Sequence, residues 1–175
     1  MIQKVVVIGN SCGGKTTLSR HLAKRHNLPL THVDSIQFLP PMRIRPHAES
    51  IAELRCVQAQ ESWLIDGYGP LDILEERLRL ANKIVFLDWP LWHHYWWCSK
   101  RQVKNLWSRR VELPADCNEN GWVQVLKSYR SLWQVHQKMR PEMLRILLLP
   151  DMREKTIFIH NNQDWRKIWT LGLSV

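Results

Sequence analysis

The segment Gly9–Thr16 constrains the fold of this chain more than any other feature. Its sequence, Gly-Asn-Ser-Cys-Gly-Gly-Lys-Thr, fits the pattern G-x-x-x-x-G-K-[ST], in which the backbone curls so that successive N–H groups point at phosphate oxygens. The apolar, β-branched run at 4–8 is typical of a strand buried on both faces. After the motif, Leu18 and Leu22 stand four apart, as on one face of a helix over 17–26. Because strand, glycine loop and helix are the context that this motif requires, the sequence predicts a phosphate loop.

The residues of this loop predict the ligands that it binds. A helix that begins at the loop adds the positive end of its dipole to the inward N–H groups. Lys15 would reach the β- and γ-phosphates as a point charge, and the Thr16 hydroxyl would be a ligand of Mg²⁺. We therefore expect ATP and Mg²⁺ as cofactors, with the nucleotide held by Gly9, Ser11, Cys12, Gly13, Gly14, Lys15, Thr16 and Thr17.

The length and the cysteines favour one domain in a reducing compartment. A chain of 175 residues is long enough for a core of its own, and we assign residues 1–175 to a single domain. It has no run of about 18 apolar residues, so we expect no membrane-spanning helix. The four cysteines lack C-x-x-C spacing, which argues against a zinc site and a disulfide framework. We expect a cytoplasmic protein.

Cys12 is a special case among the cysteines, because it lies inside the phosphate loop. Inward-facing amides near a helix N-terminus can lower the pKa of a thiol. We therefore expect MgATP to protect Cys12 from alkylation, and a packed, inert cysteine is the alternative.

The charge of the chain predicts an anionic partner. Lysine and arginine total 25 against 16 for aspartate and glutamate, which gives a formal net charge of +9. Such a partner is either nucleic acid or a polyphosphate substrate clamped by arginines. The ten tryptophans could stack on bases beside basic residues, although most tryptophans in a small domain lie in the core or in an interface. No nucleic-acid-binding module is recognisable in the sequence, so nucleic acid is an alternative and not the favoured partner.

Strands and helices alternate along the rest of the chain. Further strands are predicted at 28–33, 63–65, 83–87 and 155–159, a helix near 51–57, and long helical segments at about 91–110 and 122–149. This order indicates an α/β fold with three layers around a five-stranded parallel sheet.

Aspartates end three of the predicted strands: Asp34, Asp66 and Asp88. In an open parallel sheet, ligands bind outside the carboxyl ends of the strands. An aspartate in this place can also be a helix N-cap or a turn residue. The functional interpretation is stronger for Asp66, because an acid after an apolar strand is where a phosphate-loop protein holds the magnesium shell. Thr16 and Asp66 are therefore the predicted metal site.

Three segments resemble adenylate-kinase-like phosphate-loop kinases and, within that group, the topology modulation proteins. They are Gly9–Thr17, residues 63–68 (Trp-Leu-Ile-Asp-Gly-Tyr), and residues 84–88 followed by Pro90 and a basic helix. The similarity covers nearly the whole chain. It implies an ATP-dependent phosphotransferase with an acceptor-binding segment at about 38–60 and a helical lid at about 91–121.

The same resemblance implies which residues bind the acceptor and the base. Arg43 and Arg45 are the available phosphate clamps in the acceptor-binding segment, because a planar guanidinium binds phosphate bidentately; a solvated loop is the alternative. The loop after the last strand would contact adenine near Asn161. Asn161 and Asp164 also have the spacing of a guanine-reading N-K-x-D box, but its lysine is absent, so a GTPase switch is a weak alternative.

The lid departs from the adenylate kinase pattern at one arginine. That pattern has arginines seven and eleven residues after the proline, and from Pro90 these positions hold Trp97 and Arg101. On a continuous helix, Trp97 would lie on the basic face. We expect it to stack on the nucleotide base or on Arg101.

A second departure follows Asp66. Adenylate kinases have D-G-F-P-R there, and this chain has Tyr68 and no arginine, which leaves Tyr68 as an expected substrate contact. Arg77 and Arg101 are the expected replacements that neutralise charge in the transition state, with Arg109 and Arg110 as further candidates.

Asp34 bears on which of two classes of acceptor the protein uses. A phosphate acceptor needs no general base, whereas a hydroxyl benefits from a carboxylate that takes its proton. The resemblance favours a nucleoside monophosphate. A hydroxyl acceptor with Asp34 as base is one alternative, and an ATP-binding, nucleic-acid-associated regulator is another.

Overall fold

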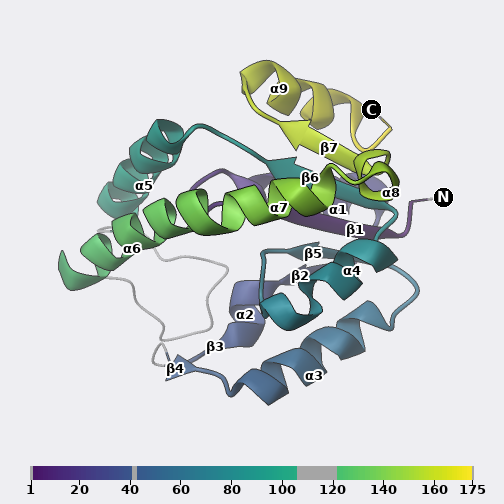
Figure 1. Cartoon of the computed structure of the whole chain (residues 1–175), viewed down its shortest axis with the longest axis horizontal. Helices are drawn as coiled ribbons and strands as arrows, with labels where there is room; N and C mark the ends of the chain where they lie inside the picture. Colours follow the sequence, from purple (N-terminus) through teal and green to yellow (C-terminus); the bar gives the residue numbers. More distant parts are fainter. Residues whose placement is uncertain (1, 41–42, 106–121, 175) are drawn as a thin grey trace.

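Five parallel strands form the central sheet of the chain, which a computed structural model describes at residues 2–40, 43–105 and 122–174 (Figure 1). Their spatial order is β2-β5-β1-β6-β7, and every neighbouring pair is parallel. Their bounds are β1 (Lys4–Gly9), β2 (Leu30–His32), β5 (Trp63–Asp66), β6 (Lys83–Leu87) and β7 (Thr156–Ile159). The predicted parallel sheet is confirmed.

The alternation of side chains along β1 creates two cores, one on each face of the sheet. Val6 and Ile8 belong to a cluster with residues of α3 (His47–Gln58), α4 (Leu74–Leu80) and α7 (Arg140–Leu147). Val5 and Val7 belong to a cluster with residues of α1 (Lys15–His26) and α9 (Asn162–Leu171). All four β1 side chains are fully buried, and each contributes roughly 1.5–3 kcal/mol of hydrophobic stabilisation. The predicted three layers follow from these two clusters.

The remaining elements lie beyond the carboxyl ends of the strands or join them. A small hairpin of β3 (Phe38–Leu39) and β4 (Arg43–Ile44), which the sequence did not predict, follows α2 (Val33–Gln37). The segment that the sequence assigns to a lid begins with α5 (Leu91–Asn105), and the described chain resumes with α6 (Trp122–Gln134), so Arg109 and Arg110 lie outside the described residues. No helix in the described parts of the chain combines the length and apolar character needed to cross a membrane.

The predicted helix over 122–149 is present but not uniform. It runs from α6 through a π-helical turn at Val135–Met139 into α7, which ends at Leu147. A 3₁₀ turn at Leu71–Ile73 precedes α4, and the short helix α8 (Pro150–Arg153) begins with a proline, which cannot continue the preceding helix. In Figure 1, α6 and α7 form one long rod across the face of the sheet.

Asp34 does not end the second strand, contrary to the prediction. Strand β2 ends at His32, which is paired in register with Asp66 of β5. Its neighbour β5 also ends there, so no strand remains for Val33 and Asp34 to pair with. Instead α2 begins at Val33, and Asp34 lies in its first turn. His32 therefore occupies the strand end that the sequence assigned to Asp34.

Candidate functional site

The turn between β1 and α1 has the backbone of a phosphate loop. Gly9 has φ +143°, and a Cβ at this position would lie 2.5 Å from the Leu87 carbonyl oxygen, so only glycine lets β1 and β6 approach here. Gly14, which precedes α1, has φ +86°. Cys12 also adopts a left-handed conformation, with φ 57°. These positive φ values turn the chain back on itself before Lys15, as the motif predicted.

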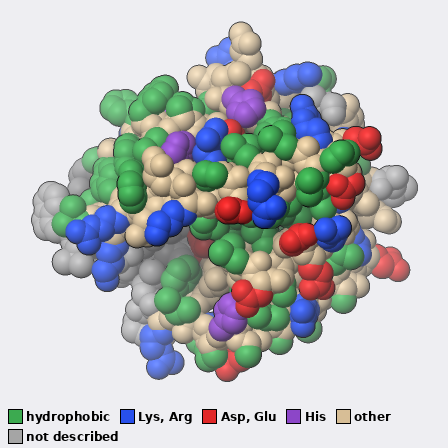
Figure 2. Space-filling model, in the orientation of Figure 1, with side chains coloured by type: hydrophobic (Ala, Val, Ile, Leu, Met, Phe, Trp, Pro, Cys, Tyr) green, Lys and Arg blue, Asp and Glu red, His purple; other side chains and the backbone are tan. Residues whose placement is uncertain are grey.

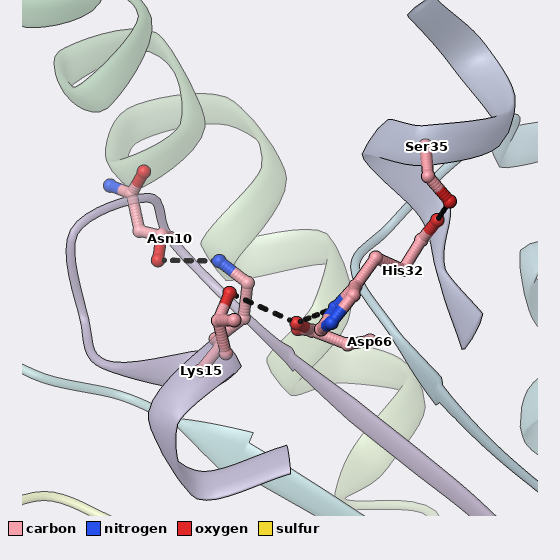
Figure 3. Close-up of polar contacts among 6 residues, drawn as sticks. Asn10, Lys15, His32, Ser35 and Asp66 are labelled. Carbon is pink, nitrogen blue, oxygen red and sulfur yellow. Dashed lines mark hydrogen bonds and ion pairs between the residues drawn. The ribbon is translucent and has the colours of Figure 1, made fainter. Parts of the chain in front are cut away.

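Lys15 bends over this loop (Figure 3). Its Nζ donates a hydrogen bond to the Asn10 carbonyl oxygen at 3.0 Å. The Asn10 side chain fixes the start of the loop: its Oδ1 accepts from the Ser11 N–H at 2.8 Å, and its Nδ2 donates to the Leu132 carbonyl of α6 at 2.7 Å. The loop is thus held by a helix more than a hundred residues away in sequence, a contact that the sequence did not predict.

The predicted metal pair, Thr16 and Asp66, lies together in the structure. The Thr16 hydroxyl donates to Asp66 Oδ2 at 3.2 Å. The His32 ring donates to the same oxygen through Nδ1 at 3.0 Å (Figure 3). The other carboxylate oxygen, Asp66 Oδ1, is buried and has no hydrogen-bond partner among the described residues. A hydroxyl and a carboxylate oxygen are donors that Mg²⁺ prefers, so these residues fit the predicted ion.

His32 is a site residue that sequence reasoning missed. The predicted strand extended one residue beyond the observed end of β2, so Asp34 and not His32 was assigned to the strand end. No local signal in the sequence marked it, because its place beside Asp66 depends on the pairing of β2 with β5.

Helix α5 covers one side of the phosphate loop through residues that the sequence did not single out. His94, which is 1% exposed, donates from Nδ1 to the Ser11 carbonyl at 2.8 Å. Trp89, just before the helix, donates from its indole N–H to the Gly13 carbonyl at 3.1 Å. Burial lowers the pKa of His94 to about 4, so its ring is neutral near pH 7. Two neutral aromatic donors therefore hold the start of α5 and the residue before it on the loop.

The lowered pKa that the loop position suggested for the Cys12 thiol is not found, and protection by MgATP stays a prediction. A hydrogen bond with the Cys98 thiol, one turn beyond His94 on α5, and burial raise the pKa of Cys12 above its usual value. Cys98 is itself fully buried. The packed and inert alternative therefore describes this cysteine better than an activated thiolate does.

The predicted arginines take different positions. Arg77 is fully buried in α4 and donates to the Tyr68 carbonyl, while its Nε and Nη1 lack hydrogen-bond partners among the described residues. Burial lowers its pKa to about 10, which leaves it charged near pH 7. Arg45 is also engaged, since its Nε donates to the Ile36 carbonyl at 2.7 Å. Arg43 is exposed, and Arg101 on α5 is half-buried and close enough to Cys12 to affect its pKa.

The predicted base-binding residues are partly engaged with their neighbours. Trp97 is 48% exposed, its indole N–H donates to His93 Nε2 at 2.9 Å, and Lys100 instead of Arg101 lies over its ring. Asn161 is the N-cap of α9, where its Oδ1 accepts from the N–H groups of Gln163 and Asp164. Because capping occupies this oxygen, the structure lends no support to a guanine-reading box.

An ion pair at the end of β6 was also missed. Asp88 is buried and binds Arg140 of α7, whose Nη2 donates to Oδ2 at 2.9 Å. His160 Nδ1 lies 3.4 Å from the same oxygen. Burial and the negative charge of Asp88 raise the pKa of Tyr68, which keeps the Tyr68 phenol protonated. Asp88 thus ties α7 to the end of β6.

Two solved structures of shikimate kinases have a similar fold. Shikimate kinase from Acinetobacter baumannii in complex with shikimate is 14% identical, with a TM-score of 0.56, and the match covers 98% of this chain and 90% of that chain. Shikimate kinase from Bacteroides thetaiotaomicron is 15% identical, with a TM-score of 0.57, over 98% of this chain and 96% of that chain. The chain has the phosphate-loop kinase fold. At such identities the likeness concerns the fold and leaves the acceptor open.

The comparisons by sequence found no similar protein. No family model and no curated protein matches the chain. The broad resemblance to phosphate-loop kinases of the adenylate-kinase-like fold is confirmed by the structures. The narrower resemblance to topology modulation proteins is not shown and stays a prediction.

Proposed function

We propose that the protein is an ATP-dependent phosphotransferase that transfers the γ-phosphate of ATP to a hydroxyl group of a small molecule. The observation that carries this proposal is the hydrogen bond between Thr16 and Asp66, with a second oxygen of Asp66 left buried and unpaired. This arrangement joins the phosphate loop to an acidic strand end, as a kinase that uses a magnesium nucleotide requires.

On the donor side, the backbone N–H groups of residues 9–16 and the Lys15 ammonium would hold the phosphates. Thr16 and Asp66 would hold Mg²⁺, which when bound neutralises charge on the phosphates. Trp97, partly exposed at the edge of α5, offers a surface on which the base can stack. Arg101 is the described arginine of α5 that we assign to the developing charge at the transferring group.

On the acceptor side, the arginines favour a hydroxyl group over a phosphate group. A nucleoside monophosphate requires free guanidinium groups around its phosphate. Of the four described arginines predicted there or in the transition state, Arg45 and Arg77 already bond backbone carbonyls. Only Arg43 of this set is exposed. We therefore place the hydroxyl acceptor ahead of the nucleoside monophosphate that the sequence favoured.

Asp34 is the residue that we assign as general base for such a hydroxyl. It lies in the first turn of α2, two residues after His32, whose ring bonds Asp66. A carboxylate in this place can take the proton of the acceptor as its oxygen attacks the γ-phosphate. Tyr68, in the loop after Asp66, is assigned to acceptor binding. The likeness to a shikimate kinase solved with shikimate, a molecule with several hydroxyl groups, agrees with this choice.

An ADP-release assay with MgATP tests the acceptor class. The panel contains shikimate, sugars and sugar acids as hydroxyl acceptors, and AMP, CMP, UMP, dTMP and GMP as phosphate acceptors. We expect one hydroxyl acceptor to stimulate ADP release, and Asp34→Asn to lower that rate about 100-fold or more. Stimulation by a nucleoside monophosphate alone would overturn the acceptor class. No stimulation by any acceptor, together with salt-sensitive binding of duplex DNA, would favour the nucleic-acid-associated regulator.

A further inference from the structure

Besides Trp97, which we assign to the nucleotide base, five apolar side chains are exposed among the described residues of α5 and α6. On α5, Trp92 is 67% exposed, and Trp96 and Val103 are each 56% exposed. On α6, Leu126 is 64% exposed and Trp133 is 50% exposed. Indole rings exposed to water are less favourable in free energy than the same rings buried in an apolar contact. We call these five residues the tryptophan face.

The tryptophan face is continuous across the seam between the two helices. The hydroxyl groups of Ser99 on α5 and Tyr129 on α6 lie 2.6 Å apart, so these two positions mark the helix contact. Residues three before and four after a position lie on the same side of a helix. Two apolar residues flank each contact position in this way: Trp96 and Val103 around Ser99, and Leu126 and Trp133 around Tyr129.

On α5, this face points away from the phosphate loop. His94 and Cys98 are the α5 residues that contact the loop, through Ser11 and Cys12. Trp92 and Trp96 are each displaced by two residues from these positions, which is more than half a helical turn. A partner bound to the α5 part of the tryptophan face would therefore approach from the side opposite the phosphate loop.

The charge around the tryptophan face predicts the kind of partner. Neither α5 nor α6 contains an aspartate or a glutamate. Lys100, Lys127 and Arg130 are exposed, and Lys100 Nζ lies 4.8 Å from the centre of the Trp96 ring. Figure 2 shows hydrophobic and basic side chains together over α5 and the start of α6, with the acidic side chains elsewhere. A second copy of the chain would bring like charges together, so the surface suits an anionic partner.

We propose that the tryptophan face binds the surface of an anionic phospholipid bilayer. Indole rings favour the interface between headgroups and acyl chains, and flanking lysines and arginines attract anionic headgroups. Val103 and Leu126 gain from burial in such an interface, whereas aliphatic side chains add nothing to base stacking. A single-stranded nucleic acid is also bound through a groove that tracks its backbone. The tryptophan face lies on the outside of two packed helices instead.

Co-sedimentation of the full chain with lipid vesicles tests this proposal. Vesicles of phosphatidylcholine and phosphatidylglycerol in equal parts should bind the protein about tenfold or more tightly than pure phosphatidylcholine vesicles, and high salt should weaken the binding. The double substitution Trp92→Ser/Trp96→Ser should weaken it about tenfold or more. Leu148→Ser, an equally exposed apolar residue after α7, is the matched control and should bind as wild type does. MgATP affinity should be the same in all three proteins.

Several outcomes would overturn the proposal. Wild-type protein that stays in the supernatant with anionic vesicles is one, and equal loss in the Leu148→Ser control is another. Binding of a single-stranded oligonucleotide that is lost in the double variant, without vesicle binding, would assign the face to nucleic acid. A wild-type dimer that is lost in the double variant would assign the tryptophan face to contact with a second copy of the chain.

The proposal stays testable if the double variant misfolds. Wild-type tryptophan fluorescence can then be measured in anionic vesicles that contain brominated lipid, which quenches indole rings at the interface. We expect quenching relative to unbrominated vesicles, and fluorescence that does not change would contradict the proposal.

Discussion

Thr16 and Asp66, 50 residues apart in the chain, are joined by a hydrogen bond of 3.2 Å between the Thr16 hydroxyl and Asp66 Oδ2. This bond brings the start of α1 to the end of β5. Replacing Asp66 by Asn removes the negative charge that would attract Mg²⁺ and should lower phosphoryl transfer about 100-fold or more. The measurement is the rate over a magnesium series. Asp72→Asn, which alters an exposed carboxylate, should leave the rate unchanged. A wild-type rate for Asp66→Asn at saturating Mg²⁺ would contradict the assignment.

His32 should orient Asp66 so that Oδ1 is the oxygen offered to the metal. The His32 ring already bonds Oδ2 at 3.0 Å. His32→Leu removes this donor and should weaken Mn²⁺ binding in the presence of nucleotide about tenfold. His32→Asn keeps a side-chain donor and should retain most of the affinity. Electron paramagnetic resonance of bound Mn²⁺ measures this directly, and equal affinities for the Leu variant and wild type would exclude the orienting role.

Stability should fall in acid because of His94. Burial lowers the pKa of His94 to about 4 from an ordinary 6.5, so the unfolded chain takes up this proton first as the pH falls. The free energy of unfolding should therefore drop between pH 6.5 and pH 4, by roughly 3 kcal/mol for this group alone. Urea unfolding of wild type and His94→Gln at several pH values measures the difference. The variant should lose less stability over this window, and identical pH slopes would refute the prediction.

Cys12 should react slowly with iodoacetamide. Its hydrogen bond with Cys98 and its burial raise its pKa, and the thiolate is the reactive form. Cys56, which is exposed, serves as the internal reference within the same sample. Peptide mass spectrometry should show Cys56 alkylated well before Cys12, and Cys98→Ala should speed the labelling of Cys12. Labelling of Cys12 at the rate of Cys56 would contradict this prediction and support the activated thiol that the loop position suggested.

The sequence was a good guide wherever a local pattern carries the information. The buried run at 4–8 and the helix after the loop depend on residues close in the chain, and both were found in place. The pair of Thr16 and Asp66 was also foreseen, because a motif and a strand end each have a fixed position in such a sheet. These parts of the site needed no knowledge of tertiary packing.

Contacts between distant elements were beyond the reach of the sequence. The bonds from Leu132 and His94 to the phosphate loop depend on how α6 and α5 pack, which no local pattern encodes. Arg77 was assigned to the reaction because of its charge, yet it is buried and holds the loop after Asp66. The predicted strand before Asp34 ran one residue too far, since the length of β2 is set by its pairing with β5.

The central claim is that the phosphate loop supplies a γ-phosphate to a hydroxyl group, and ³¹P nuclear magnetic resonance tests it most directly. With MgATP and the acceptor panel, wild-type protein should convert the γ-phosphate signal into the signal of a phosphate monoester and leave ADP. Lys15→Ala should abolish this conversion while it retains the circular dichroism of the folded protein. Formation of inorganic phosphate alone, or of a nucleoside diphosphate from an added monophosphate, would contradict the claim.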